Sequence, residues 1–314
     1  MKQFKQLVHN EIMKIFRRTA TKIMFLLLLT VVIISGLVFR FMIMDNTVDD
    51  AAAGENGVSI NIAAENDELS PGEQRQLEEQ LLLQQYYEAE GVEPLTAEHV
   101  WNFVIANADT LSFITMFTVI IAAGIVAGEH TQGTIKLLLI RPVKRWKILL
   151  SKWTATMLFS FTMLIALIAF SWIVGLLFFQ FNIGPSRWIE VVQGEIRDWH
   201  AGYYALIEYG LNFVSVIIMT TFAFMIGTVF RNTSLAIGLS LVAMFTGGQI
   251  VYLLSQYDWI KYVLFANTNL IQYVYNNPMI EGMTMPFSIT MLSVYFAVFL
   301  AIATITFSKR DVAE

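Results

Sequence analysis

Six long apolar segments dominate the pattern of hydrophobic and polar positions along the chain. A helix needs roughly 20 apolar residues to cross about 30 Å of hydrocarbon. Six segments reach this length: 23–44, 103–127, 153–179, 209–230, 235–257 and 282–308. A membrane β-barrel would instead show segments of about ten residues with alternating polarity. The pattern predicts an all-α fold, a polytopic membrane protein with six transmembrane helices.

The first 22 residues have a helical amphipathic pattern. Apolar residues recur at helical spacing from Phe4 to Phe16, with basic residues beside them. Such a segment is typical of a helix that lies in the membrane interface, so residues 1–22 are predicted to form a cytoplasmic interfacial helix. Glu11 interrupts the apolar side, and two interpretations remain open: a local ion pair with Lys14 or Arg18, or a contact with a partner protein. The first span is longer than a signal-peptide core and is predicted to remain as an anchor.

The segment 45–102 is predicted to be an acidic extracytoplasmic insertion. It holds 14 acidic residues and one basic residue. Residues 45–70 are rich in Asn, Gly, Asp and Glu and are predicted to form a flexible loop. Residues 71–90 are predicted to form a helix, with Ser70 as the N-cap. We expect this helix to pack against another external element or a second subunit, and an acidic surface that attracts cationic substrates is the functional alternative.

Two further external segments, 180–208 and 258–281, are predicted to be loops that carry aromatic residues. These are Trp188, Trp199, Tyr203, Tyr204, Trp259 and Tyr262. Aromatic residues at span ends usually form interfacial belts, and a lateral exit for an amphipathic substrate is the alternative. A short turn over 231–234 and a tail over 309–314 complete the predicted cytoplasmic side.

Composition and charge strengthen the membrane assignment and orient it. Of the 314 residues, 56% are hydrophobic and 14% charged, against about 25% charged in soluble domains. This balance excludes an ordinary soluble protein, a disordered chain and a nucleic-acid binder. Fifteen Lys and Arg residues fall on the side of the N-terminus and five on the other. The bias predicts a multi-pass protein with both termini cytoplasmic, and the absence of cysteine is consistent with a bacterial cell membrane.

The cytoplasmic loop 128–152 carries the most specific pattern. Residues 129–140 are predicted to form a short helix that Pro142 ends. Ile135, Leu138 and Leu139 give this helix a small apolar face. Such a helix suits docking in a groove of a partner protein. The alternative is a basic flank that serves only to set the topology.

The order of residues in this loop resembles the cytoplasmic loop of ABC type-2 permeases, the transmembrane subunits of bacterial ABC exporters. The residues that carry the resemblance are Glu129, Gly133, Thr134, Lys136, Leu138, Leu139, Arg141, Pro142 and Arg145. Near the N-terminus, Glu11, Lys14, Arg17 and Arg18 are similar to the interfacial helix that precedes the first span in this family. The number of spans and the position of both termini also agree.

The resemblance implies a function and its partners. Residues 129–140 would be the coupling helix, seated in a cleft of a separate nucleotide-binding subunit that supplies ATP hydrolysis. The permease would work with a second copy or a similar permease and would export a hydrophobic or amphipathic substrate, such as a lipid, a peptide antibiotic or a drug. ATP and Mg would bind to the partner ATPase, and no cofactor is expected on this chain. The insertion 45–102 departs from members with short external loops and leaves the substrate class open.

Motifs for other chemistries do not occur in the sequence. It contains no G-x-x-x-x-G-K-[ST] phosphate loop, no H-E-x-x-H and no G-x-S-x-G, so we expect no catalytic or metal-binding residues and no enzyme activity on this chain. Arg40, Asp109 and Glu208 lie near span ends, whereas ion-driven carriers usually place ionisable groups at mid-membrane. The alternatives are a carrier that is not coupled to ATP, and a membrane scaffold or sensor with a ligand-binding external loop.

Overall fold

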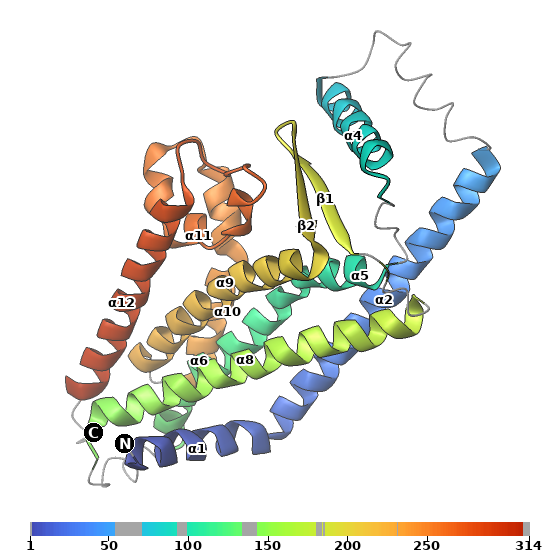
Figure 1. The fold of residues 1–314 in the computed structure, drawn as a ribbon. Helices are drawn as coiled ribbons and strands as arrows, with labels where there is room; N and C mark the ends of the chain where they lie inside the picture. Colours follow the sequence, from blue (N-terminus) through green and yellow to red (C-terminus); the bar gives the residue numbers. More distant parts are fainter. Residues whose placement is uncertain are drawn as a thin grey trace. The chain divides into compact units, whose positions relative to one another are not determined.

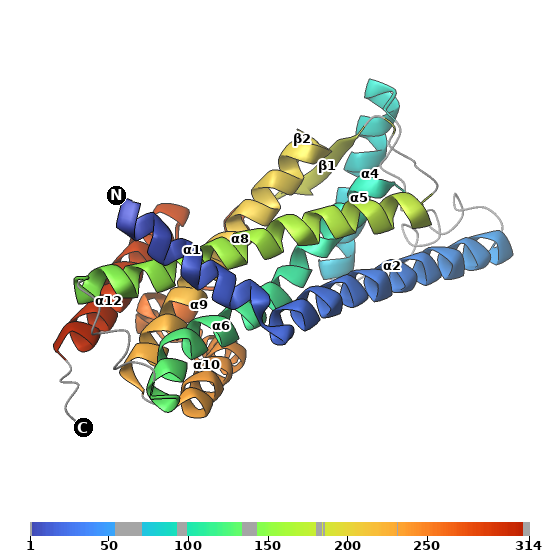
Figure 2. The ribbon, with the colours of Figure 1, turned by 90° about the horizontal axis from the view of Figure 1, so that it is seen from below.

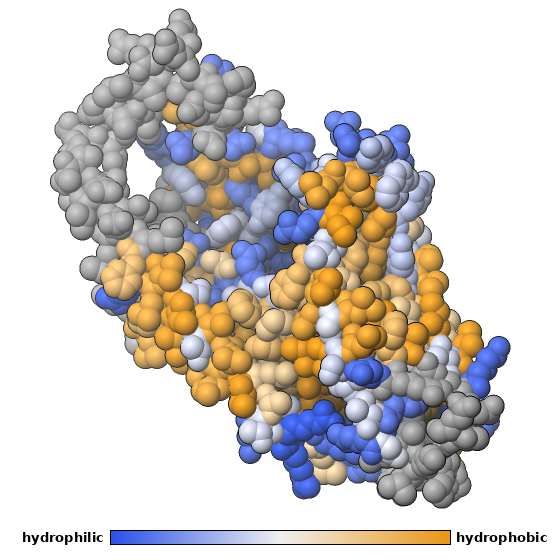
Figure 3. Space-filling view, turned by 180° about the vertical axis from the view of Figure 1, so that it is seen from behind, coloured by the Kyte–Doolittle hydropathy of each residue, from blue (hydrophilic) through white to orange (hydrophobic). Residues whose placement is uncertain are grey.

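The computed structural model describes residues 2–53, 71–92, 99–133, 143–179, 184, 186–230 and 232–309. Six of its helices are long and apolar enough to cross a membrane. They are Thr19–Phe41, Val100–Thr131, Arg145–Phe178, Ala201–Val229, Thr233–Leu253 and Met285–Lys309. Figure 3 shows the broad hydrophobic surface that the helices present. The prediction of an all-α polytopic membrane protein is confirmed.

The chain forms two compact units. Unit 1 comprises residues 1–30, 109–168 and 209–314, and unit 2 comprises residues 31–108 and 169–208. Unit 1 contains helix α1 (Lys2–Arg17), α6 (Leu111–Thr131), α10 (Thr233–Leu253) and α12 (Met285–Lys309). Three long helices contribute residues to both units: α2 (Thr19–Ala53), α8 (Arg145–Phe178) and α9 (Ala201–Val229).

In unit 1 the amphipathic helix α1 meets the first spanning helix α2 at Arg18. The chain changes direction sharply there (Figure 1). The buried hydroxyl of Thr21 donates a hydrogen bond of 2.5 Å to the carbonyl of Ile15, and the amide of Thr21 bonds to the carbonyl of Arg18. These bonds satisfy backbone groups that the break between the two helices exposes. Helix α1 therefore has a fixed direction relative to the start of α2.

Helices α6 and α9 pack closely against each other in unit 1, and α10 packs on α6. The hydroxyls of Thr220 on α9 and Thr118 on α6 are 3.0 Å apart and fully buried. Gly227 on α9 faces the backbone of Ala123 on α6 so closely that a Cβ atom would overlap it. Small residues allow backbones to approach in this way inside membranes.

The segment after α10 is ordered, although it was predicted to be a loop. It forms η2 (Asp258–Tyr262), α11 (Leu264–Asn267) and η3 (Ile271–Tyr273) around an apolar cluster that includes Val251, Ile260 and Ile280. The Asn267 amide donates to the carbonyls of Lys261 and Val263, and its oxygen accepts from the Ser288 hydroxyl at 2.8 Å. This network ties the segment to α12.

Unit 2 contains a β-hairpin that the sequence analysis did not predict. Strands β1 (Arg187–Val192) and β2 (Glu195–His200) pair in antiparallel register, with Trp188 opposite Trp199. Gln193 and Gly194 have positive φ angles of 54° and 82°, as a two-residue hairpin turn requires. Residues 180–208 were predicted to be a loop. The structure instead has this hairpin and, from Ala201, the first turns of α9.

Helix α4 (Pro71–Glu90) of unit 2 occupies the range predicted for a helix and packs on β1. The hydroxyl of Tyr86 donates to Asp198 at 3.2 Å, and Asp198 also forms an ion pair with Arg187. The same unit contains α5 (Val100–Ala106) and the end of α2. Trp101 of α5 lies edge-on to Trp172 of α8, with the ring centroids 4.8 Å apart.

The prediction of a flexible loop over 45–70 is wrong for its first residues. Helix α2 continues to Ala53, and residues 54–70, with the predicted N-cap Ser70, lie outside the described part of the chain. Extending an existing helix avoids the unfavourable nucleation step, and Ala51, Ala52 and Ala53 have the highest helix propensity. The polar composition of this segment therefore did not end the helix.

Candidate functional site

Four charged side chains from three helices meet in unit 1. The ammonium of Lys152 on α8 lies 2.9 Å from Oε2 of Glu11 on α1 and 2.5 Å from Oε1 of Glu129 on α6. The ammonium of Lys14 on α1 lies 3.1 Å from Glu11 and 3.4 Å from Glu129. Glu11, Lys14, Glu129 and Lys152 are named the charge cluster below. Figures 1 and 2 both show α1 beside the start of α8.

Because the charge cluster is largely buried, the loss of any one of its charges would cost folding free energy. The side chain of Lys152 is 1% exposed and that of Glu11 is 9% exposed, whereas Lys14 is about half exposed. A buried ion that loses its partner is strongly destabilising, since no water replaces the lost interaction. Two carboxylates and two ammonium groups balance each other here. The cluster therefore holds α1, α6 and α8 together as long as all of its members are present.

The pKa of Glu11 is lowered from its usual value. Burial of the carboxyl opposes its ionisation, but the nearby charges of Lys152 and Lys14 and their hydrogen bonds outweigh that effect. Glu11 is consequently ionised at neutral pH. Of the two interpretations of Glu11, the structure has the local ion pair with Lys14, and it adds the pair with Lys152.

The charge cluster lies at the entrance to the loop that carries the resemblance. Glu129 belongs to the last turn of α6, which ends at Thr131, and Gly133 follows in a turn with a φ angle of +68°. The prediction that a separate helix begins at residue 129 is therefore wrong. The spanning helix continues through Gly128 and Glu129 to Thr131, so it includes Glu129.

Both ends of this loop are attached to neighbouring helices of unit 1. On the α6 side, the hydroxyls of Thr131 and Thr233 are 3.0 Å apart, which connects α6 to the start of α10. On the α8 side, Arg145 donates a hydrogen bond of 3.2 Å to the carbonyl of Ser308 near the end of α12. A displacement of the loop would thus act on α6, α8, α10 and α12.

The structure brings together Glu11, Lys14 and Glu129 among the residues that the sequence singled out. Gly133 and Arg145 lie at the two ends of the loop, and Arg17 and Arg18 lie at the end of α1. Six of the predicted coupling residues lie outside the described part of the chain: Thr134, Lys136, Leu138, Leu139, Arg141 and Pro142.

The sequence analysis did not predict that Lys152, the last residue of the cytoplasmic loop 128–152, pairs with Glu11 and Glu129. A signal for its role exists. Lys152 lies on the same side of α8 as the buried residues Ile148, Ala155 and Phe159, and a lysine on an apolar helix face requires a carboxylate partner. The side of the N-terminus holds only four acidic residues in the sequence, Glu11, Glu129, Asp311 and Glu314, so few carboxylates are available as partners.

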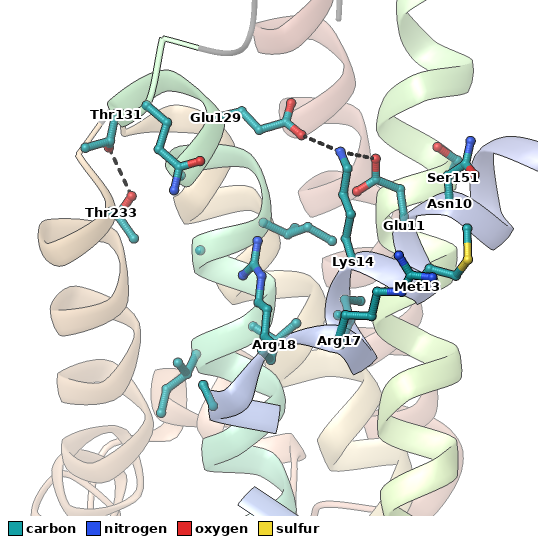
Figure 4. Close-up of a pocket in the computed structure, with 18 of the residues that line it drawn as sticks. Asn10, Glu11, Met13, Lys14, Arg17, Arg18, Glu129, Thr131, Ser151 and Thr233 are labelled. Atoms are coloured by element: carbon teal, nitrogen blue, oxygen red, sulfur yellow. Dashed lines mark hydrogen bonds and ion pairs between the residues drawn. The ribbon is translucent and has the colours of Figure 1, made fainter. Parts of the chain in front are cut away.

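An open pocket of about 1100 Å³ adjoins the charge cluster within unit 1. Its walls come from α1, the start of α2, the last turns of α6 and the starts of α8 and α10. Figure 4 shows Glu11 and Glu129 turned toward Lys14 at its edge, and Arg18 projecting between α1 and α6. Among the described residues, no group of three or more His, Asp or Glu side chains is arranged to hold a metal ion.

Comparison with known proteins shows the family to which the chain is similar. The sequence profile of the family described as "Protein of unknown function (DUF2705)" matches residues 78–313. The chain is 36% identical over 320 residues to "Uncharacterized protein YhcI" of Bacillus subtilis (strain 168), which covers 98% of this chain and 99% of that protein. It is also 35% identical over 198 residues to "Uncharacterized membrane protein YdbK" of the same strain, over 62% of this chain and 76% of the relative.

Proposed function

The chain belongs to the DUF2705 family, and we propose that it is the transmembrane permease subunit of an ATP-driven ABC exporter. A separate nucleotide-binding subunit would bind and hydrolyse ATP. The substrate would be hydrophobic or amphipathic, such as a lipid, a peptide antibiotic or a drug, because the spans are rich in Met, Phe and Leu. The protein itself would carry out transport and no covalent chemistry.

The proposed orientation follows the distribution of Lys and Arg along the chain. Three quarters of these residues, fifteen of twenty, lie at the N-terminus, in the loop between α6 and α8, in the short segment between α9 and α10, and at the end of α12. Such residues accumulate in cytoplasmic segments close to span ends. In this orientation both termini and the charge cluster face the cytoplasm, where ATP is available. The membrane would be a bacterial cell membrane, and the hairpin of unit 2 and α4 would lie on its outer side.

One observation carries the proposal: the charge cluster connects the loop between α6 and α8 to the interfacial helix α1. Glu129 stands four residues before Gly133, and Lys152 stands on the first turns of α8. Lys152 pairs with Glu11 of α1, and Glu129 pairs with Lys14 of α1 and with Lys152, all at distances of hydrogen bonds. A subunit that pushed on this loop would move α1, α6 and α8 together. This is the mechanical linkage that an ATP-driven permease needs.

The proposed mechanism uses this linkage. ATP binding would close a pair of nucleotide-binding subunits, and each would displace the loop of the permease seated in it. Helices α6 and α8 would shift with the loop, and α1 would follow through Lys152 and Glu11. The arrangement of spans between two permease copies would change from open on the inside to open on the outside. A ligand can drive such a change only through its different affinity for the two states.

The test compares Glu129 variants in complexes of the chain with its ATPase, reconstituted in lipid vesicles. Glu129→Ala is expected to remove most of the permease-dependent change in ATPase rate, while insertion into the membrane stays normal. The conservative variant Glu129→Asp is expected to recover part of it, because it keeps a carboxylate beside Lys152 and Lys14. Glu78→Ala, on the exposed face of α4, is the matched control. An unchanged ATPase response in Glu129→Ala would contradict the proposed linkage.

A membrane sensor is the second candidate function, favoured by one feature of unit 2. Helix α4 is held on the hairpin by the hydrogen bond from Tyr86 to Asp198 and by the ion pair of Asp198 with Arg187. A folded external element of this kind suits the binding of an extracellular ligand. In a sensor, Asp198→Asn would abolish the response to the ligand. In the exporter, the same variant would leave the ATPase response to the permease intact.

A further inference from the structure

The pocket beside the charge cluster has a cationic end and an apolar end. Its polar lining includes Asn10, Arg17, Arg18 and Gln132, and its apolar lining includes Met24, Ile121 and Ile125. All of these residues belong to unit 1. The pocket therefore offers hydrogen-bond donors and positive charge at one end and hydrocarbon contacts at the other.

The polar end of the pocket coincides with the ends of three spans. Arg18 directly precedes the span Thr19–Phe41, Thr131 ends the span Val100–Thr131, and Thr233 begins the span Thr233–Leu253. The apolar lining lies deeper along the same helices. Gly124 is seven residues inside the end of its span, which is about 10 Å along the helix axis. The two ends thus match the depth of a lipid headgroup and of its acyl chains.

Two of the basic residues that line the pocket, Arg17 and Arg18, are not balanced by a carboxylate of the pocket. Glu11 and Glu129 are neutralised by Lys14 and Lys152 within the charge cluster. Arg17 and Arg18 make no ion pair with any carboxylate in the part of the chain that the structure describes, and both are exposed. Arginine presents a planar set of donors that matches phosphate oxygens. An anion at this end would therefore meet positive charge that no internal carboxylate neutralises.

Glycines open the deeper part of the pocket. A Cβ atom at Gly124 would have only ordinary contacts, at 3.8 Å to Ile237 and 3.9 Å to Thr233, and one at Gly128 would have a single contact at 3.9 Å. The space beside α6 is thus available to a ligand. A larger side chain at Gly124 would extend into this space without a clash of its Cβ atom.

From these observations we propose that this pocket binds the phosphate headgroup of an anionic phospholipid, with an acyl chain along Gly124 and Ile125. The site holds the lipid at the junction of α1 and α2, next to the charge cluster. This inference is independent of the proposed ATPase partner. It requires only that α1 lies at a membrane surface that carries anionic lipids.

The test measures lipid retention and stabilisation in the purified full-length chain. After detergent extraction, native mass spectrometry is expected to show retained phosphatidylglycerol. Added phosphatidylglycerol is expected to raise the unfolding temperature, whereas phosphatidylcholine and inorganic phosphate are not. The double variant Arg17→Gln/Arg18→Gln is expected to weaken phosphatidylglycerol binding by about fivefold for each arginine.

A charge-matched variant separates a specific site from general attraction to anionic membranes. Lys5→Gln/Lys22→Gln removes two exposed cations of the same region that do not line the pocket. It is expected to keep the retained lipid and the stabilisation. Equal losses in the two double variants would overturn the proposal, as would equal stabilisation by inorganic phosphate.

A second pair of variants tests the apolar end. Gly124→Leu is expected to reduce lipid retention because the side chain fills the pocket, while the number of charges is unchanged. Gly238→Leu on α10 is the control, because Gly238 is exposed, has open space around it and does not line the pocket. Both variants must elute as single species in detergent. Full lipid retention by Gly124→Leu would contradict the placement of the acyl chain.

Discussion

The ammonium of Lys152 lies 2.9 Å from a carboxylate oxygen of Glu11, although 141 residues separate the two along the chain. The same ammonium contacts Glu129. One buried lysine thus fixes the interfacial helix α1 against α6 and α8, the two helices between which the loop with the coupling resemblance lies. The charge cluster would be the structural basis of the proposed function, which depends on moving this loop.

Lys152→Met is expected to destabilise the protein by about 3 kcal/mol, since removing one member of a buried pair leaves its partners uncompensated. Glu11 and Glu129 would then share the half-exposed Lys14 as their remaining cation, which leaves one carboxylate charge uncompensated. Thermal unfolding of the detergent-solubilised protein, followed by circular dichroism, measures this loss.

The triple variant Glu11→Gln/Glu129→Gln/Lys152→Met is the control for Lys152→Met. It removes the two carboxylates together with the buried lysine, and replacing a whole buried ion cluster by neutral groups is often close to neutral in stability. It is expected to be more stable than Lys152→Met alone. If the single variant unfolds at the same temperature as the wild type, the cluster does not hold the helices together.

Acidification is expected to weaken the charge cluster through Glu11. The folded state lowers the pKa of this carboxyl, so its contribution to stability is complete above the ordinary glutamate pKa of about 4.3. The contribution is lost as the pH falls through the lowered pKa of the folded state. The difference in unfolding temperature between the wild type and Glu11→Gln should therefore be constant near neutral pH and shrink in acid. A difference that grows in acid would contradict the assignment.

Gly133 is expected to be intolerant of a side chain for backbone reasons alone. Its φ angle is +68°, and a Cβ atom there would have nothing within 4 Å. Gly133→Ala should cost about 1 kcal/mol, which corresponds to about a fivefold increase in hydrogen exchange at the end of α6. Gly133→Asn should cost less, because asparagine tolerates this conformation better. Equal exchange in the alanine variant and the wild type would show that the turn is not adopted.

Gly227 is expected to be essential for the contact between α9 and α6. Because a Cβ atom there would overlap the backbone of Ala123, Gly227→Ala must separate the two helices and should destabilise the protein by about 1–3 kcal/mol. Gly238→Ala is the matched control in open space, where the higher helix propensity of alanine should give a neutral or small stabilising effect. Thermal unfolding in detergent compares the two. Equal stability of both variants would contradict the close packing.

The spans, α1 and α4 were predictable because each depends on a local pattern of apolar residues. The pairing of Glu11 with Lys14 was also predictable, since residues three apart are neighbours on a helix. The pairing of Glu11 with Lys152 was not predicted, because no local rule connects residues on different helices. A buried lysine requires a carboxylate partner, and this rule would have limited the possible partners of Lys152 to a few acidic residues.

The hairpin over residues 187–200 and the extension of α2 show where composition misleads. Gln193 and Gly194 occupy a turn between two short runs that contain β-branched and aromatic residues. This pattern is typical of a hairpin, but the sequence analysis interpreted the aromatic residues as an interfacial belt. In α2, the polar residues 45–53 follow an uninterrupted helix and continue it. Propensity is a weak prior that an adjoining helix overrides.

The most direct test of the central claim uses the absence of cysteine in the chain. A single cysteine at Gln132, in the turn after α6, would carry a photo-activated cross-linker in native membranes, and a single cysteine at Glu195, exposed at the start of β2, would be the control. The account predicts that the Gln132 variant captures, in about equal copies, an ATPase subunit with a phosphate-binding G-x-x-x-x-G-K-[ST] loop, and that the Glu195 variant does not. Cross-linking of no such ATPase from Gln132, with the protein correctly inserted, would contradict the function proposed for this chain.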